Sequence, residues 1–378
     1  MVPQLAERAA HCESLRRCPD ETIAAFYDTG LMQMMQPRRY GGSELNIDVA
    51  GEVAQTLAGG CASSSWVWLN LATHSWNIGQ FGQEAQDDVW GADNRAVAAT
   101  GLAFPCGRAE RVAGGYRLSG RWPFGSGVDS ATWMIAGAMV AQADKTEERR
   151  WFLVPKAEFT SLGNWQAFGL AGTGSNDVEM RDVFVPEHRT VRPELLASGI
   201  DAPGASLSDS PVYRLPAYSA FGFALAAVPL GAARAALDRF TSSFRERAGT
   251  FSGARLAELS PVQLRVAEAA SSIAFAETAY RADIHALVTF SEAGQAVPDA
   301  VKLGWKCNLA FGVVLCKRSI ESLLSASGGG GLSTGSALQR SYRDILAASS
   351  HIALNWDMQA SLYGRHALGV PLDPKALF

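Results

Sequence analysis

The sequence predicts an α+β protein in which an N-terminal helical domain, a central β domain and a C-terminal four-helix bundle follow one another. Apolar residues recur with a helical period over residues 1–96, with a period of two over 97–212, and with a helical period again over 213–378. The 378 residues are enough for two to three packing units. No internal repeat is visible, so we expect three different units.

The charge balance excludes two classes of partner. The 33 Lys and Arg residues against 37 Asp and Glu residues give a net charge of −4. There is thus no basic field for nucleic acid or for an anionic membrane surface. Charged residues make up 19% of the chain, below the roughly 25% of an average soluble domain. This low share indicates that surface is buried between subunits, and we expect a homo-oligomer.

The cysteines and the apolar runs indicate a cytoplasmic protein. The six cysteines are scattered and form no Cys-x-x-Cys pair, so the sequence predicts neither a metal site nor a disulfide framework. They are expected to be reduced, buried thiols. The N-terminus lacks a hydrophobic signal core. The uncharged run 215–233 is interrupted by prolines and glycines, and we interpret it as a buried core helix.

The first 96 residues are expected to form at least three helices. Asp20 can cap the first of these, which ends before a Pro-Arg-Arg-Tyr-Gly-Gly breaker at 37–42. The next helix is expected at about 48–58. A third apolar segment spans 66–76 and follows a run of small residues.

Near Ala96 the pattern changes to short β-prone runs separated by glycine turns. Residues 111–118 are typical of a hairpin, because the turn Gly114-Gly115 tolerates positive φ. Further strands are expected at 132–140, 151–154 and 178–185. These strands predict a compact barrel or sandwich.

The last third carries three explicit helix starts after a loop rich in Ser, Pro and Asp at 197–216. Ser260-Pro261-Val262-Gln263 predicts an N-cap with a capping box, and the Ser336–Gln339 segment repeats that box. Pro298 can open the helix between them. Four long helices of this kind make a bundle.

Several short motifs stand at the joints of these segments. They are 37–42, Trp-Val at 66–67 leading to Thr-His-Ser-Trp at 73–76, Gly-Arg-Trp-Pro-Phe-Gly-Ser-Gly at 120–127, the glycine-rich run 168–178, Val-Phe-Val-Pro at 183–186, and Tyr-Arg-Asp at 342–344 with His351. In this order they resemble the acyl-CoA dehydrogenase fold. They resemble more closely its branch of two-component flavin-dependent monooxygenases, which includes the oxygenase components of 4-hydroxyphenylacetate hydroxylase and of the steroid-ring phenol hydroxylase.

The resemblance implies an enzyme of defined class. It would be the oxygenase component of a flavin-dependent monooxygenase, using O2 and reduced FMN, or FADH2, supplied by a separate NAD(P)H:flavin reductase. Through a C4a-hydroperoxyflavin it would hydroxylate a phenolic or other small aromatic substrate, as a homotetramer. The sequence shows no dinucleotide-binding fingerprint for NADH, which agrees with a separate reductase that supplies the reduced flavin. N- or S-oxygenation by the same flavin, an acyl-CoA dehydrogenase reaction, and a silent flavin-binding scaffold remain alternatives.

The usual base of the dehydrogenases is missing from its place. By resemblance to the Arg-Asp helix of those enzymes, the catalytic glutamate would stand at Ile352. Some dehydrogenases carry the base on an earlier helix, where Glu246, Glu268 and Glu277 remain possible. The neighbouring His351 is the residue that the hydroxylases show.

Three residues near the end of the chain are candidates for catalysis and substrate binding. Asp344, His351 and Asn355 follow at intervals of seven and four residues, which predicts one stripe of a helix. His351 could accept a phenolic proton near neutral pH. A structural histidine that bonds a neighbouring carbonyl is the simpler alternative. By resemblance, His74 lines the substrate and flavin pocket as a second catalytic anchor, although it could instead pack against Trp76.

The remaining candidates concern the cofactor, and the resemblance assigns their roles. Trp122 is expected to be cofactor-binding, at the border of the flavin ring. Ser126, in the Gly-Ser-Gly loop after it, would face flavin N5 and is counted as both catalytic and cofactor-binding. Thr173 and Ser175 would meet the flavin or its phosphate. Arg245 or Arg247, with Arg247 preferred, would reach the flavin phosphate from a neighbouring subunit. Each segment could also be an ordinary turn or a solvated helix end.

Overall fold

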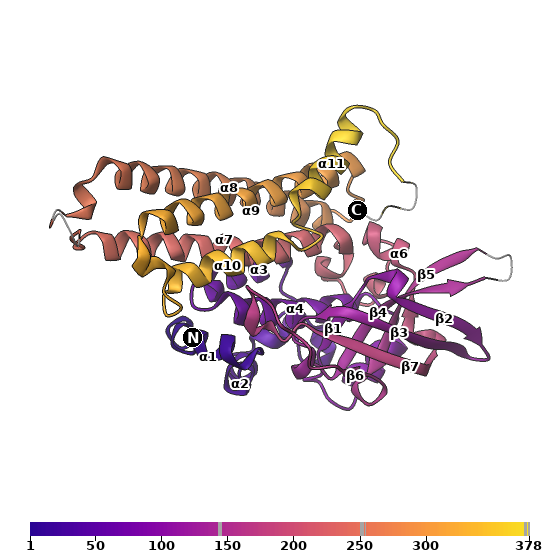
Figure 1. The fold of residues 1–378 in the computed structure, drawn as a ribbon. Coiled ribbons are helices and arrows are strands. Elements are labelled where there is room, and N and C mark those ends of the chain that lie inside the picture. The colour runs from indigo at the N-terminus through magenta and orange to yellow at the C-terminus, as the bar shows by residue number, and fades with distance from the viewer. Residues whose placement is uncertain (143–145, 250–252, 254, 374–375, 377–378) are drawn as a thin grey trace.

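The three segments fold in the predicted order. The computed structural model describes residues 1–142, 146–249, 253, 255–373 and 376. Figure 1 shows N-terminal helices below a bundle of long helices, with the β-sheet at one end of the molecule. The predicted α+β architecture is therefore confirmed.

The N-terminal helices are arranged around one central helix. The five are α1 (Val2–Leu15), α2 (Asp20–Asp28), α3 (Ile47–Ala58), α4 (Ala62–Gly79) and α5 (Gln83–Trp90). Helix α4 is buried along almost its whole length, between other helices and the edge of the sheet. The expected cap at Asp20 is wrong, because Pro19 is the N-cap and the Asp20 carboxylate accepts hydrogen bonds from Arg17 instead.

The central unit is a mixed sheet whose strands run in the order β6-β7-β3-β2-β4-β5-β8, with β1 paired to β4. The hairpin is confirmed: β2 and β3 are antiparallel, and Gly114 has a φ of 77°. A register shift between Trp122 and Gly125 interrupts the pairing of β3 with β7 just before Ser126. The strands are β1 (Ala98–Gly101), β2 (Gly107–Val112), β3 (Gly115–Gly125), β4 (Trp133–Ala141), β5 (Glu147–Pro155), β6 (Thr160–Ser161), β7 (Asn176–Pro186) and β8 (Thr190–Val191).

Three helices of the C-terminal bundle begin within one residue of the predicted start signals. After the short α6 (Pro193–Ser198) come α7 (Ala217–Phe244), α8 (Ser260–Glu292), α9 (Asp299–Ala326), α10 (Ala337–Ser349) and α11 (Trp356–Ala367). The two capping boxes are wrong, because neither α8 nor α10 has a side-chain cap. Gln263 and Gln339 donate instead to the carbonyls of Ala257 and Thr334.

Helix α7 is the core helix that the uncharged run predicted. It is the one helix in the described part of the chain that is long and apolar enough to cross a membrane, yet 83% of its apolar window is buried in the protein. It packs against α3, α4, α8, α9 and α10. Helix α7 thus joins the bundle to the N-terminal helices.

Trp122 lies inside the sheet. Its indole is fully buried, and its Nε1 donates to the carbonyl of Gly137 at 2.7 Å. A Cβ at Gly101, Gly107 or Gly120 would lie within 2.9 Å of its side chain. The expected cofactor contact of Trp122 is therefore corrected: the indole fills a space left by glycines of its own strand and of two others, and it offers no exposed atom to a ligand.

Replacing Trp122 by Ala should destabilise the protein strongly, because it leaves a cavity between strands and an unpaired Gly137 carbonyl. We expect a loss of about 3–5 kcal/mol in the free energy of unfolding, measured by urea denaturation. Trp356→Ala is the control, since its side chain is 37% exposed. Equal losses for the two variants would contradict this packing argument.

Candidate active site

A chain of hydroxyl groups connects α4 to the loops before β4 and β7. The indole Nε1 of Trp66 donates to Ser126 Oγ at 3.1 Å, and Ser126 Oγ lies 2.8 Å from Ser175 Oγ. Ser175 Oγ lies 2.7 Å from Thr173 Oγ1, which donates to the carbonyl of Leu170 at 2.8 Å. Three predicted cofactor residues, Ser126, Thr173 and Ser175, therefore share one hydrogen-bonded chain.

The direction of these hydrogen bonds follows from counting hydrogens. The proton of Thr173 is used on a carbonyl, so Ser175 must donate to Thr173, and Ser126 must donate to Ser175. Ser126 Oγ also accepts from Trp66. What remains on Ser126 is one lone pair, which suits an N–H or O–H donor on a ligand.

Two aromatic rings stand beside this chain. Phe124 has a φ of 64°, unusual for a residue with a side chain, and is 68% exposed. Its ring meets that of half-buried Trp165 nearly at right angles, with 6.3 Å between centroids. Trp165 Nε1 donates to the Leu170 carbonyl, the acceptor at the end of the hydroxyl chain. Strain of this kind, at an exposed ring beside polar groups, is typical of ligand-binding sites.

His351 reaches the same place through Trp66, but from a turn and not from a helix. Helix α10 ends at Ser349, and Asn355 caps α11 by accepting from the backbone N–H of Met358. The predicted stripe of Asp344, His351 and Asn355 is therefore wrong. The His351 ring meets the edge of Trp66 with 5.8 Å between centroids.

Asp344 holds a loop and does not face the hydroxyl chain. It is 6% exposed and accepts from the N–H of Leu170 at 2.7 Å. Burial raises the pKa of Asp344 to about 7. A Cβ at Gly169 would lie 1.9 Å from the Arg343 carbonyl, so the loop is pressed against α10. Asp344 thus positions residues 168–175, and the predicted substrate contacts of Asp344 and Asn355 have no support in these bonds.

The two candidate histidines are neutral and have opposite tautomers. The Ala98 carbonyl lies 2.8 Å from His74 Nδ1 and can only accept, so that nitrogen carries the hydrogen and Nε2 has a lone pair. His351 Nδ1 accepts from the N–H of Ala353, so its hydrogen is on Nε2. Burial lowers the pKa of each ring to about 4. At neutral pH, His74 Nε2 is a hydrogen-bond acceptor and His351 Nε2–H is a hydrogen-bond donor.

One face of α4 links these groups. Trp66, Asn70 and His74 follow at intervals of four residues, so they lie on one side of the helix about 12 Å from end to end. At the far end, His74 Nε2 lies 3.3 Å from Thr100 Oγ1 and its ring meets Phe221. The candidate site therefore runs from Ser126 to His74. Sequence reasoning missed Trp66 and Thr100, although the spacing of Trp66, Asn70 and His74 could have indicated the first.

Arg247 lies at the other end of α7. Its guanidinium donates to the Ser327 carbonyl at 3.4 Å, beside a glycine run at 328–331. For Arg245, the described contact is made by its backbone carbonyl, which accepts from Arg255. From Phe221 to its end at Phe244 the helix extends about 35 Å, so Arg247 lies far from the His74 end of the candidate site.

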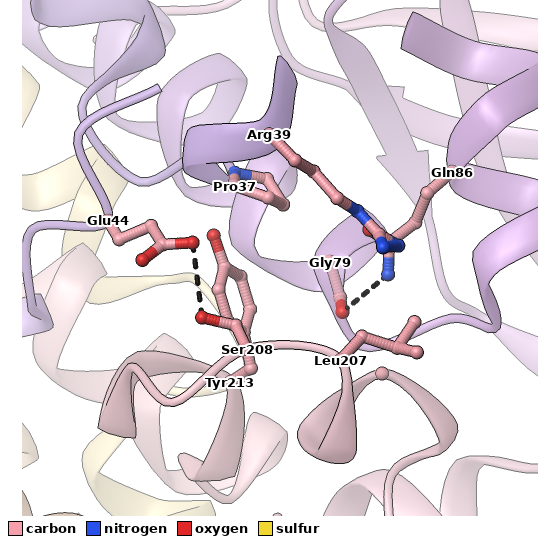
Figure 2. Close-up of a pocket in the computed structure, with 9 residues that line it drawn as sticks. Pro37, Arg39, Glu44, Gly79, Gln86, Leu207, Ser208 and Tyr213 are labelled. Carbon is pink, nitrogen blue, oxygen red and sulfur yellow. Dashed lines mark hydrogen bonds between the residues drawn. The ribbon is translucent and has the colours of Figure 1, made fainter. Parts of the chain in front are cut away.

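A small polar cavity elsewhere contains none of the candidate residues. It measures about 60 Å³ and is lined by the 37–42 motif and by residues of the 204–213 segment. Figure 2 shows Glu44 accepting from the Ser208 hydroxyl and Gln86 donating to the Gly79 carbonyl across it. It has room for a few water molecules.

None of the positions considered for the catalytic base of a dehydrogenase offers a free carboxylate beside His351. Ile352 is aliphatic and 62% exposed. Glu277 forms an ion pair with Arg234, with 2.6 Å between Oε2 and Nη2. Glu246 and Glu268 are exposed.

Comparison with known proteins places the chain in a class and then in a family. Residues 2–93 match the acyl-CoA dehydrogenase N-terminal domain and residues 223–356 match the C-terminal domain, so the protein is of the acyl-CoA dehydrogenase type. It is 32% identical to the oxygenase subunit of a flavin-dependent monooxygenase from Rhodococcus jostii, over 98% of this chain and 97% of that one. It is 33% identical to the oxygenase component of an FADH2-dependent resorcinol hydroxylase from Rhizobium, over 98% and 92%.

A solved structure agrees with these relatives. XiaF from Streptomyces, in complex with FADH2 and glycerol, superposes with a TM-score of 0.92 at 32% identity, over 99% of this chain and 94% of that one. The chain belongs to the family of flavin-dependent monooxygenase oxygenase components. The monooxygenase class expected from the sequence is confirmed, and the missing base agrees with it.

Replacing Asp344 by Asn should change the pH dependence of stability. Between the pKa of an unfolded Asp, 3.8, and the folded value of about 7, the folded state binds a proton that the unfolded state lacks. Asp344 therefore destabilises the fold increasingly as pH rises through this window, and Asn does not. Relative to the wild type, Asp344→Asn should gain up to about 1.4 kcal/mol for each pH unit, measured by denaturation from pH 4 to 8. Asp344→Ala, which lacks the acceptor for Leu170, should be less stable than Asp344→Asn at every pH. A constant difference between wild type and Asp344→Asn would contradict the shift.

Proposed function

We propose that this enzyme hydroxylates a small phenolic substrate held between Ser126 and His74. The observation that carries the proposal is the pair of opposite tautomers at the two ends of one face of α4. A phenol needs a hydrogen-bond acceptor for its O–H, because drawing that proton away from the oxygen makes the ring more electron-rich and more ready to attack an electrophilic oxygen. His74 Nε2 would be that acceptor, in place of the Thr100 hydroxyl that lies 3.3 Å from it. This reverses the expected role of His351, whose Nε2–H can only donate.

The flavin end of the site is formed by Ser126 and the two exposed rings. Reduced flavin, when bound, supplies the electrons that activate O2. Ser126 would hold it by accepting a hydrogen bond from the N5–H of the reduced ring, since one lone pair is what the hydroxyl chain leaves free. Phe124 and Trp165 would cover the ring and exclude water. Two relatives have FADH2 in their names, so we propose FADH2 as an alternative to the expected FMN.

The partners follow from the same family. An oxygenase component works with a separate reductase, for which we propose an NAD(P)H:flavin reductase. Arg247 and the 328–331 run would meet the flavin phosphate of a neighbouring protomer, because backbone N–H groups and a guanidinium both suit phosphate oxygens. This contact would be made across protomers of the expected homotetramer.

Replacing His74 by Asn or by Gln should distinguish the effect of its Nε2 acceptor from the effect of its size. Asn can keep the hydrogen bond to the Ala98 carbonyl but has no acceptor at the Nε2 position, whereas the Gln oxygen can reach that position. We expect His74→Asn to lower the rate of phenol hydroxylation by about 100-fold and His74→Gln to lower it less. Oxidation of reduced flavin should continue in both.

The pH profile of phenol binding provides the matching check on the wild type. Because the pKa of His74 is lowered to about 4, phenol affinity should stay constant from pH 8 to 6 and fall only as the ring becomes protonated near pH 4. A loss of affinity centred near pH 6.5 would show an ordinary histidine and contradict the assignment.

Replacing Ser126 by Ala should uncouple flavin oxidation from hydroxylation. The variant loses the acceptor for reduced flavin and leaves the Trp66 N–H without a partner. After an oxygen pulse to the anaerobic protein with reduced FMN or FADH2, we expect several-fold more hydrogen peroxide per flavin oxidised and correspondingly less product. Ser14→Ala is the control, since Ser14 bonds only its own helix at the surface. If the ratio of product to hydrogen peroxide is unchanged in Ser126→Ala, Ser126 does not hold the flavin.

A further inference from the structure

Asn70 is the one residue of α4 that is not buried. The other residues of this 18-residue helix are all buried, and the helix lies wholly within the described residues 1–142. Asn70 stands one turn after Trp66 and one turn before His74, on the face that carries the candidate site. Its accessible surface therefore marks an open space in the middle of that site, between the two ends where Trp66 and His74 make their contacts.

The amide of Asn70 is held in one orientation. Its Nδ2 donates to the Trp66 carbonyl at 2.8 Å, and a carbonyl can only accept, so the nitrogen end of the amide is turned back toward Trp66. Oδ1 therefore points away from Trp66. It has no hydrogen-bond partner among the described residues, and it is open to solvent, unlike the enclosed and unpaired amide of Asn77. Asn70 thus presents an acceptor oxygen to the open space.

The stability of the helix does not explain an amide at this position. Leu or Ala favours a helix more than Asn does. The bond to the Trp66 carbonyl does not require Asn either, because Thr73 makes the same kind of bond to the Leu69 carbonyl at 2.7 Å. What Asn70 adds is a carbonyl oxygen at the end of a planar group. This oxygen is suited to a ligand that brings a donor.

Asn70 and His74 form a pair of acceptors on one helix face. His74 Nε2 has a lone pair because its Nδ1 carries the hydrogen. Side chains four residues apart on a helix have Cβ atoms about 5–6 Å apart, which is the same scale as the distance between two substituents across a benzene ring. A ring that donates one O–H to His74 can therefore donate a second O–H or N–H to Asn70.

We propose that Asn70 determines substrate specificity, by accepting a hydrogen bond from a second donor group on the phenol. This inference rests on the proposed function, and it names the substrate class: a single-ring phenol that carries a further hydroxyl or amine on the ring or one carbon from it. The first hydroxyl lies at His74 Nε2 and the second donor at Asn70 Oδ1, so the ring lies along α4. A phenol without the second donor leaves the amide oxygen unpaired beside the ring.

Two matched pairs of phenols test the assignment. Resorcinol is compared with 3-methoxyphenol, and 4-hydroxybenzyl alcohol with 4-ethylphenol, because the first of each pair has a second donor and the other has none. Affinity for the flavin-free protein is measured by calorimetry, and KM and product are measured under reduced flavin and O2. In at least one pair the donor should bind about fivefold or more tightly than its partner. Equal affinities within both pairs would overturn the role of Asn70.

Variants locate the effect on the amide. Asn70→Ala and Asn70→Leu remove the acceptor, so the preference for the donor of the pair should disappear in both, although the two side chains differ in size. Thr73→Val is the matched control, since it removes a bond to a backbone carbonyl from the same helix at a buried position. The preference should be unchanged in Thr73→Val.

The outcomes separate this inference from the function beneath it. A preference that persists in both Asn70 variants, or that is lost equally in Thr73→Val, would overturn the role of Asn70 and leave the phenol hydroxylase intact. Oxidation of flavin with no product from any of the probes would count against the proposed function. In that case a binding preference that only the Asn70 variants abolish would still support Asn70 as the acceptor.

Discussion

Helix α4 is buried along almost its whole length, and the two polar side chains that mark the ends of the candidate site bond inside the protein. Trp66 and His74 cannot turn to solvent, so they bond to the Ser126 loop and to β1. These bonds orient the two side chains rigidly, and the helix fixes the distance between them. The site is therefore positioned by a helix that cannot move without exposing its core, and the loops around it need only meet that helix.

Those loops are fixed by close approach of their backbones. Gly172 lies where a Cβ would meet Cys12 Sγ at 2.3 Å, and Gly169 is pressed against α10. Asp344 adds one buried hydrogen bond to the same loop. Residues from the N-terminal helices, the sheet and the bundle thus converge on the 168–175 segment. A change in the packing of any one of these three units would therefore shift the positions of Thr173 and Ser175.

Much of the fold could be predicted because it depends on local patterns. The change from a helical period to a period of two, the Gly114-Gly115 turn and the starts at Ser260, Pro298 and Ser336 are all properties of neighbouring residues. The site was predicted less well. The end of α10 at Ser349 is marked by no glycine or proline. The sequence pattern therefore predicted a helix through His351, whereas the helix ends before it. Likewise, a sequence motif around Trp122 cannot tell an indole that faces a ligand from one that fills a space left by glycines, because two of those glycines, Gly101 and Gly107, lie on other strands.

Helix α7 carries a part of the candidate site near one end and an arginine just beyond the other. Phe221 and Arg247 are joined by rigid helix for most of the distance between them. Inserting one residue in this helix would turn everything beyond it by about 100° and move it by about 1.5 Å. Substitutions along α7 can therefore be accommodated by repacking, whereas a change in its length would rotate and displace one end of the helix relative to the other. Over evolution, insertions and deletions should accumulate in the surface loops of this chain and be nearly absent from α7.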